Sequence, residues 1–63
     1  MDFGEGIRRL RTARDLTRAQ LAEASGVSAD TIYQIERRGV SPRLSTVESL
    51  AAALGVTTAE LVS

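Results

Sequence analysis

The 63-residue chain predicts an all-α fold, a compact domain of five short helices. Apolar residues recur at spacings of three and four through nearly the whole sequence, which is the period of a helix. Thr17, Ser45 and Thr57 are each followed three residues later by Gln or Glu, a pattern typical of helix starts. No run alternates apolar and polar residues as a half-buried strand would. A chain this short forms one domain at most, so we expect a single domain over residues 1–63.

The first expected helix spans about residues 4–14. Phe3, Ile7 and Leu10 mark its apolar face. Asp15 follows at the position where a helix-ending residue is expected, because Asp tolerates the left-handed backbone conformation better than most residues. The chain is therefore expected to turn there towards a second helix.

The second expected helix spans about residues 18–25. Thr17 is a suitable N-cap, and Gln20 completes a capping box with it. Leu21 faces the core, together with the small Ala22. Gly26 is the natural left-handed residue after the helix.

The third expected helix spans about residues 29–37. Ser28 caps it, and Asp30 is favourably placed in its first turn, where the helix dipole attracts a negative charge. Ile32 and Ile35, one turn apart, are expected to face inward.

A loop follows, since Gly39 and Pro42 both interrupt helices. The fourth expected helix spans about residues 46–54, with Ser45 and Glu48 as a second capping box. Its apolar positions are Val47, Leu50, Ala51 and Leu54.

Gly55 is expected to end the fourth helix. Thr57 and Glu60 form a third capping box, which predicts a short last helix over about residues 58–62. Its apolar residues are Leu61 and Val62.

The charges of this chain are segregated although they sum to zero. All eight basic residues are arginine: five lie between Ile7 and Arg18, three lie between Arg37 and Arg43, and none follows Leu44. Such a distribution predicts a basic face and an acidic back. Arginine is suited to bidentate contacts with phosphate and guanine, so the pattern favours a nucleic-acid partner.

The composition argues against an enzyme. The chain has no His, Cys or Lys, so no base stands ready to activate a nucleophile, and its scattered carboxylates lack metal-ligand spacing. We expect no catalytic residue, cofactor or metal site. No apolar run approaches the roughly 20 residues that span a membrane. A cytoplasmic location is expected, because secreted domains of this size usually carry disulfides.

The segment TRAQLAEASGVSADTIYQIER, residues 17–37, satisfies the steric demands of two helices that cross steeply after a short turn. Ala22 is small where the second helix crosses the first. Gly26 can take a positive φ in the turn, and Val27 can fill the corner. Ile32 is a branched residue that can lock the second helix down. All of these residues in register indicate a helix-turn-helix.

Together with the opening IRRLRTARDLTRAQLAEASGVS and the ending LAAALGVTTAELVS, this segment resembles the Cro and phage-repressor (Xre-type) family of helix-turn-helix domains. The resemblance covers nearly the whole chain. It implies a phage-repressor-like fold in which helices 2 and 3 form the reading unit. It also implies a DNA-binding transcriptional regulator of repressor type, a homodimer at least on DNA. The recognition helix, residues 28–37, would enter the major groove of double-stranded DNA.

The resemblance assigns roles to individual residues. Arg11 and Glu36 match an internal ion pair that ties the first helix to the end of the third. The residues that match phosphate contacts are Thr17, Arg18, Ser28, Thr31, Arg37, Arg38, Ser41 and Arg43. The residues that match exposed, base-facing positions of the recognition helix are Ala29, Asp30, Tyr33 and Gln34. Thr31 could also reach a base edge.

Elementary physics adds to several of these roles. A cation at a helix N-terminus stabilises the helix poorly, so Arg18 is expected to face an anion. Gln34 could bond an adenine edge, and Ala29 could touch only a thymine methyl group. Asp30 could accept from cytosine, but we give more weight to its role as a stabilising helix N-terminal charge. Tyr33 could pack against the second helix or stack on sugar-phosphate, and the sequence does not decide between them.

Several features leave a second hypothesis open. Arg38 stands where the family often has glycine, and Ser25 stands where an apolar residue is frequent. The net charge of zero and the acidic Asp30 disfavour DNA. The alternative is a helix-turn-helix scaffold with weak or no DNA binding: an antitoxin-like protein-interaction domain, or a designed or trimmed fold, with which three capping boxes are also compatible.

Overall fold

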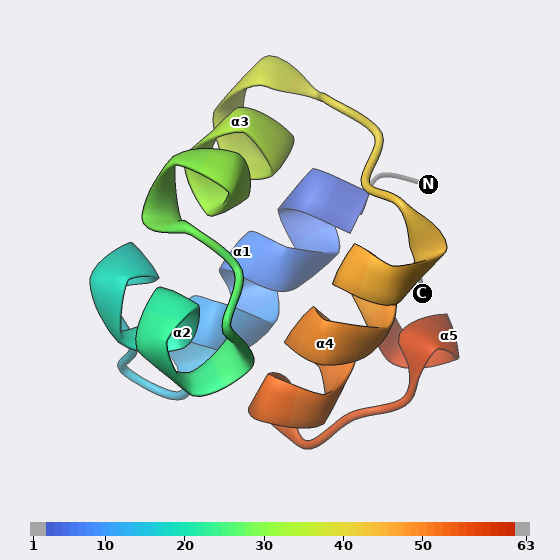
Figure 1. The fold of residues 1–63 in the computed structure, drawn as a ribbon. Coiled ribbons are helices and arrows are strands. Elements are labelled where there is room, and N and C mark those ends of the chain that lie inside the picture. The colour runs from blue at the N-terminus through green and yellow to red at the C-terminus, as the bar shows by residue number, and fades with distance from the viewer. Residues whose placement is uncertain (1–2, 62–63) are drawn as a thin grey trace.

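The fold of the protein is described from a computed structural model, for residues 3–61. Five helices follow one another: α1 (Phe3–Ala13), α2 (Arg18–Ser25), α3 (Ala29–Arg38), α4 (Leu44–Leu54) and α5 (Thr58–Leu61) (Figure 1). Between residues 3 and 61 there is no strand. The all-α, five-helix prediction is confirmed. No helix in this part of the chain combines the length and apolar character needed to cross a membrane.

The helices enclose one core. Helix α1 packs against α3, α4 and α5, while α2 packs against α3 and α4 (Figure 1). The dimensions of the described part are 24 × 22 × 20 Å. The buried apolar residues come from all five helices and are Ile7, Leu21, Ile32, Ile35, Val47, Leu50, Ala51, Leu54 and Leu61. The apolar faces that the sequence predicted thus point inward, and Val62 lies outside the described residues.

Two glycines let α1 approach its neighbours closely. Gly4 and Gly6 are buried in α1. A Cβ atom at Gly4 would meet the backbone carbonyl oxygen of Ile35 in α3, and one at Gly6 would meet that of Leu61 in α5. Glycine is normally unfavourable inside a helix, so its presence here is explained by the lack of room for any side chain.

The start of α2 is capped as the sequence predicted. The Thr17 hydroxyl accepts a hydrogen bond from the Gln20 amide at 3.0 Å, and the Gln20 side-chain oxygen accepts one from the Thr17 amide at 2.8 Å. Asp15 has a φ of 55° and Gly26 a φ of 77°, both in the left-handed region. The turns on either side of α2 therefore have the expected conformations.

The predicted capping box of Ser45 and Glu48 is wrong. Helix α4 begins at Leu44, its N-cap is Arg43, and no side chain caps it. The Val47 amide donates to the Arg43 carbonyl oxygen at 3.0 Å. Ser45 therefore already lies within the first turn, where its helical backbone removes it from the capping position. The fourth helix starts two residues earlier than predicted.

The last predicted capping box is present. The Thr57 hydroxyl accepts from the Glu60 amide at 3.3 Å, and the Glu60 carboxylate accepts from the Thr57 amide at 3.0 Å. Gly55 ends α4 with a φ of 71°. These contacts turn the chain so that α5 lays Leu61 into the core.

Candidate nucleic-acid interface

The corner between α2 and α3 is short and tightly bonded. Gly26 caps α2, and its amide donates to the Ala22 carbonyl oxygen at 2.9 Å. The Ser25 hydroxyl accepts from the Val27 amide at 3.1 Å. Ala22 and Val27 are partly buried against the core. Ser25, which the sequence analysis treated as a departure from the family, thus bonds the turn itself.

This corner leaves one flank of α3 in solvent. Ile32 and Ile35 point into the core. Ala29, Asp30 and Tyr33 are exposed, and Gln34 is half-buried. All four predicted base-facing residues therefore lie outside the core.

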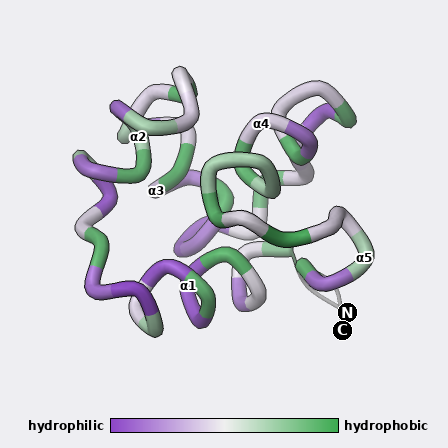
Figure 2. The backbone as a smooth tube through the Cα atoms, turned by 90° about the horizontal axis from the view of Figure 1, so that it is seen from below, coloured by the Kyte–Doolittle hydropathy of each residue, from purple (hydrophilic) through white to green (hydrophobic). Residues whose placement is uncertain are grey.

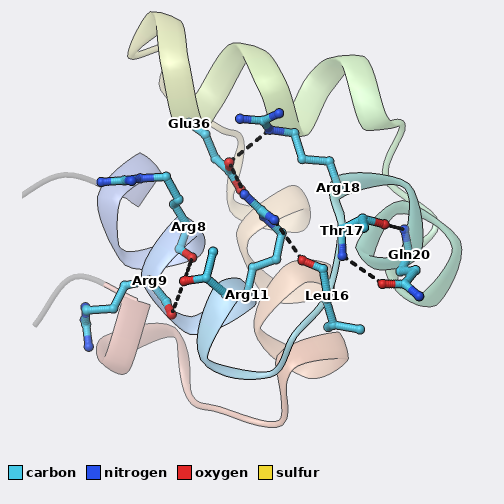
Figure 3. Close-up of polar contacts among 9 residues, drawn as sticks. Arg8, Arg9, Arg11, Leu16, Thr17, Arg18, Gln20 and Glu36 are labelled. Carbon is cyan, nitrogen blue, oxygen red and sulfur yellow. Dashed lines mark hydrogen bonds and ion pairs between the residues drawn. The ribbon is translucent and has the colours of Figure 1, made fainter.

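A buried carboxylate fastens α3 to α1. The side chain of Glu36 is 0% exposed and that of Arg11 is 10% exposed. Arg11 donates from Nε to Glu36 Oε2 at 2.8 Å and from Nη2 to Oε1 at 3.0 Å (Figure 3). Its Nη1 donates to the Leu16 carbonyl oxygen at 2.8 Å. The pair that the family resemblance implied is present as a bidentate contact, and it also holds the α1–α2 turn.

Arg18 is a third member of this cluster. Its Nε donates to Glu36 Oε1 at 3.0 Å (Figure 3), and its side chain is 31% exposed. Its guanidinium also lies over the Tyr33 ring, 5.2 Å from the ring centroid. The sequence predicted that Arg18 faces an anion, and within the chain that anion is the Glu36 carboxylate. Sequence reasoning missed this partner because Glu36 is 18 residues away and already had a partner.

Two of the predicted phosphate-contacting hydroxyls, those of Thr17 and Ser28, serve as helix caps. The Thr17 hydroxyl caps α2. The Ser28 hydroxyl accepts from the Thr31 amide at 3.1 Å and donates to the Thr31 hydroxyl at 2.7 Å. The Thr31 hydroxyl keeps its own proton for another acceptor, since it is the acceptor in this bond.

The loop after α3 starts one residue later than the family pattern suggested. Arg38 is helical, and Gly39, with a φ of 68°, is the left-handed residue that ends α3. A pocket of about 250 Å³ lies between α3 and this loop. Its lining residues are Thr31, Gln34, Ile35, Val40, Ser41, Pro42, Arg43 and Thr46. Four predicted contact residues (Thr31, Gln34, Ser41 and Arg43) thus gather around one hollow, whereas Arg37 and Arg38 are exposed elsewhere on the end of α3.

No group of three or more His, Cys, Asp or Glu side chains within residues 3–61 is arranged to hold a metal ion. Over the same residues, every buried side-chain nitrogen and oxygen has a hydrogen-bond partner.

Comparison with known proteins identifies the family that has this architecture. The family described as a helix-turn-helix domain matches residues 2–63. The chain belongs to this helix-turn-helix family. The resemblance inferred from the sequence is confirmed.

Two curated relatives of this helix-turn-helix domain are phage or bacterial repressors by name. The cryptic phage CTXphi transcriptional repressor RstR of Vibrio cholerae is 46% identical over 61 residues, which cover 97% of this chain and 55% of that protein. The HTH-type transcriptional repressor RghR of Bacillus subtilis is 52% identical over 56 residues, which cover 86% of this chain and 41% of that protein. The chain spans about half the length of the curated relatives it matches.

A solved structure shares the whole arrangement. The restriction-modification controller protein C.AhdI from Aeromonas hydrophila superposes with a TM-score of 0.88 at 36% identity, over 94% of this chain and 89% of that one. In this helix-turn-helix domain, then, the exposed flank of α3 is the outer surface of the second helix of the motif.

Proposed function

We propose that this helix-turn-helix domain binds duplex DNA as the reading part of a transcriptional repressor. The observation that carries the proposal is the exposed outer flank of α3. Glu36 bonds this helix to both α1 and α2. A helix presented in this way fits the major groove, which is about 12 Å wide. The names of the related repressors support the same function.

Base reading falls to the first turns of α3, because recognition helices contact bases chiefly with their N-terminal residues. Ala29 offers a methyl group, and Gln34 offers an amide that suits adenine. Asp30 stabilises the start of α3 and, if it meets a base, accepts from cytosine. The half-buried Gln34 lines the pocket beside α3, which restricts where its amide can point.

Phosphate binding falls to residues around this flank. Arg37 and Arg38 extend from the end of α3, while Ser41 and Arg43 lie in the following loop. Thr17 and Ser28 cap the N-termini of α2 and α3, where free backbone amides favour an anion. Contacts of this kind supply most of the affinity for DNA, so a locally basic surface serves even in a chain of zero net charge.

A two-fold dimer on DNA would place two copies of α3 about 34 Å apart, one turn of the duplex. We therefore expect two half-sites in the preferred DNA sequence. A cytoplasmic location, where duplex DNA is accessible, goes with this function.

The decisive experiment is selection of bound duplexes from a random pool, followed by gel shift of the winning sequence across a salt series. Binding should weaken steeply as salt rises, because each phosphate contact releases counterions. Arg43→Met should weaken binding of all duplexes alike and lower the salt slope by about 0.9. Arg9→Met removes the same charge from a side chain directed away from α3 (Figure 3) and should leave binding unchanged.

Failure to bind at low salt, or affinity that does not respond to salt, would favour the alternative function, a protein-interaction scaffold. Asp30→Asn separates the two as well. In a DNA reader, it removes a repulsive charge and should raise the affinity or shift the preferred base. In a scaffold, it should only lower stability by a few tenths of a kcal/mol through the lost helix N-terminal charge.

A further inference from the structure

We infer that Tyr33 acts through Arg18: its ring holds the Arg18 guanidinium so that the terminal nitrogens meet a DNA phosphate. Tyr33 is then a positioning residue and not a base reader. The inference rests on the proposed function and assigns specific roles to two residues of the candidate interface, Arg18 and Tyr33.

The contacts of Arg18 hold its guanidinium on two sides. Its Nε donates to Glu36 Oε1 at 3.0 Å, and its Cζ lies 5.2 Å from the centroid of the Tyr33 ring. Tyr33 and Glu36 are three residues apart, so they are neighbours on one face of α3. Arg18 therefore reaches from α2 and lies along one turn of α3. One edge of its guanidinium contacts the Glu36 carboxylate, and one face lies over the Tyr33 ring.

The hydrogen bond to Glu36 uses Nε alone (Figure 3). The two terminal nitrogens, which form the outer side of the guanidinium fork, make no hydrogen bond to any residue between 3 and 61. A guanidinium binds phosphate through two parallel N–H donors, so this outer side is suited to one phosphate group.

The positive charge of Arg18 is not fully neutralised within the domain. Glu36 already receives two hydrogen bonds from Arg11, so its single negative charge is shared between two guanidinium groups. The cluster of Arg11, Arg18 and Glu36 has a net charge of +1. Arg18 is the more exposed of the two arginines, 31% against 10%, and so presents this charge to solvent.

The Tyr33 ring, and not its hydroxyl, makes the contact. The hydroxyl has no hydrogen-bond partner between residues 3 and 61, while the ring faces the guanidinium. A ring face attracts a cation and fixes the plane in which it lies. Arg18 is the first residue of α2, where the helix dipole disfavours a cation. The Tyr33 ring and the Glu36 carboxylate therefore stabilise its guanidinium at this position.

The test is a double-mutant cycle on affinity for the selected duplex. Arg18→Met keeps the stem without the charge and should weaken binding about tenfold, with a salt slope lower by about 0.9. Tyr33→Leu should weaken binding about two- to fivefold at every sequence. Tyr33→Phe keeps the ring and should bind like the wild type. The double variant Arg18→Met/Tyr33→Leu should be no weaker than Arg18→Met alone, and Arg9→Met is the charge-matched control.

Three results would overturn the inference: additive losses in the double variant, a loss in Tyr33→Phe equal to that in Tyr33→Leu, or a changed base preference in any Tyr33 variant. Each would mean that Tyr33 touches DNA itself. Thermal unfolding of every variant checks that the substitutions leave the fold intact.

A measurement without DNA separates this inference from the proposed function. The ring current of Tyr33 should shift the Arg18 side-chain protons upfield in the NMR spectrum of the wild type and of Tyr33→Phe, and the shift should vanish in Tyr33→Leu. An absent shift in the wild type overturns the inference even if DNA binds. A normal shift together with no DNA binding means that the proposed function has failed, and the phosphate contact fails with it.

Discussion

The two sides of this small domain are stabilised differently. Helices α4 and α5 carry no basic residue and supply five of the nine buried core residues: Val47, Leu50, Ala51, Leu54 and Leu61. The α1–α3 side carries seven of the eight arginines, the eighth being Arg43 at the N-cap of α4, and both ion pairs found in residues 3–61 converge there on Glu36. Figure 2 shows the difference as hydrophilic stretches along α1 and its turn against the more hydrophobic course of α4. Apolar burial on one side thus supports a charged cluster that orients α3 on the other.

The largest expected effect is in the apolar side. Leu50→Ala removes a fully buried side chain and should lower the free energy of unfolding by about 2–5 kcal/mol, as much as a domain this small is expected to have. Leu44→Ala is the matched control, because Leu44 is in the same helix and 69% exposed, so it should change little. Urea unfolding followed by circular dichroism measures both. Equal losses in the two variants would refute the assignment of the core to α4.

The next effect tests the charged side. Glu36→Ala leaves the guanidinium of Arg11 largely buried without its carboxylate, and should lower the free energy of unfolding by about 3 kcal/mol. Glu48→Ala, an exposed glutamate of α4, should cost less than about 0.5 kcal/mol. If the two substitutions proved equal in a thermal melt, the cluster would contribute nothing to holding α3.

A smaller effect concerns the place where the two sides meet. Gly6→Ala would normally stabilise a helix by about 0.5–1 kcal/mol. Here the added Cβ meets the Leu61 carbonyl oxygen, so α5 must move and we expect a loss of about 1–3 kcal/mol instead. Gly4→Ala should act in the same direction through the Ile35 carbonyl oxygen of α3. A rise in melting temperature for either variant contradicts the close approach of these helices.

The smallest effect compares two helix starts, one on each side. Thr17→Ala removes an observed cap and should lower the free energy of unfolding by about 1 kcal/mol. Ser45→Ala changes a residue in a similar sequence pattern that makes no cap, and should be neutral or slightly stabilising because Ala favours helix interiors. Chemical unfolding of the pair resolves them. A loss at Ser45 equal to that at Thr17 would show that a hydroxyl does cap α4.

Local patterns in the sequence were enough to place the five helices, the left-handed Asp15 and Gly26, and two of the three capping boxes. They failed for Ser45 and Glu48, because a Ser followed three residues later by Glu can lie either at the N-cap or within the first turn of a helix. They also gave no role to Gly4 and Gly6, whose constraint comes from backbone atoms of Ile35 and Leu61, far along the chain.

The candidate site was predicted as a set of residues and not as an arrangement. Family likeness gave the pairing of Arg11 with Glu36, and helix electrostatics indicated that Arg18 needs an anion. Only the fold brings Arg18 onto the same carboxylate and over Tyr33. The contact joins residues of two different helices, and spacing along one chain carries no information about it.

The convergence of three helices on one hidden carboxylate has a mechanical consequence. Because Arg11 of α1 and Arg18 of α2 both bond Glu36 of α3, tilting or sliding α3 would break three hydrogen bonds at once. A surface of this stiffness has little capacity to mould itself to a partner. On a duplex whose groove is slightly too narrow or too straight, we expect the DNA to bend or widen, so that the flexibility of base-pair steps contributes to the choice of site.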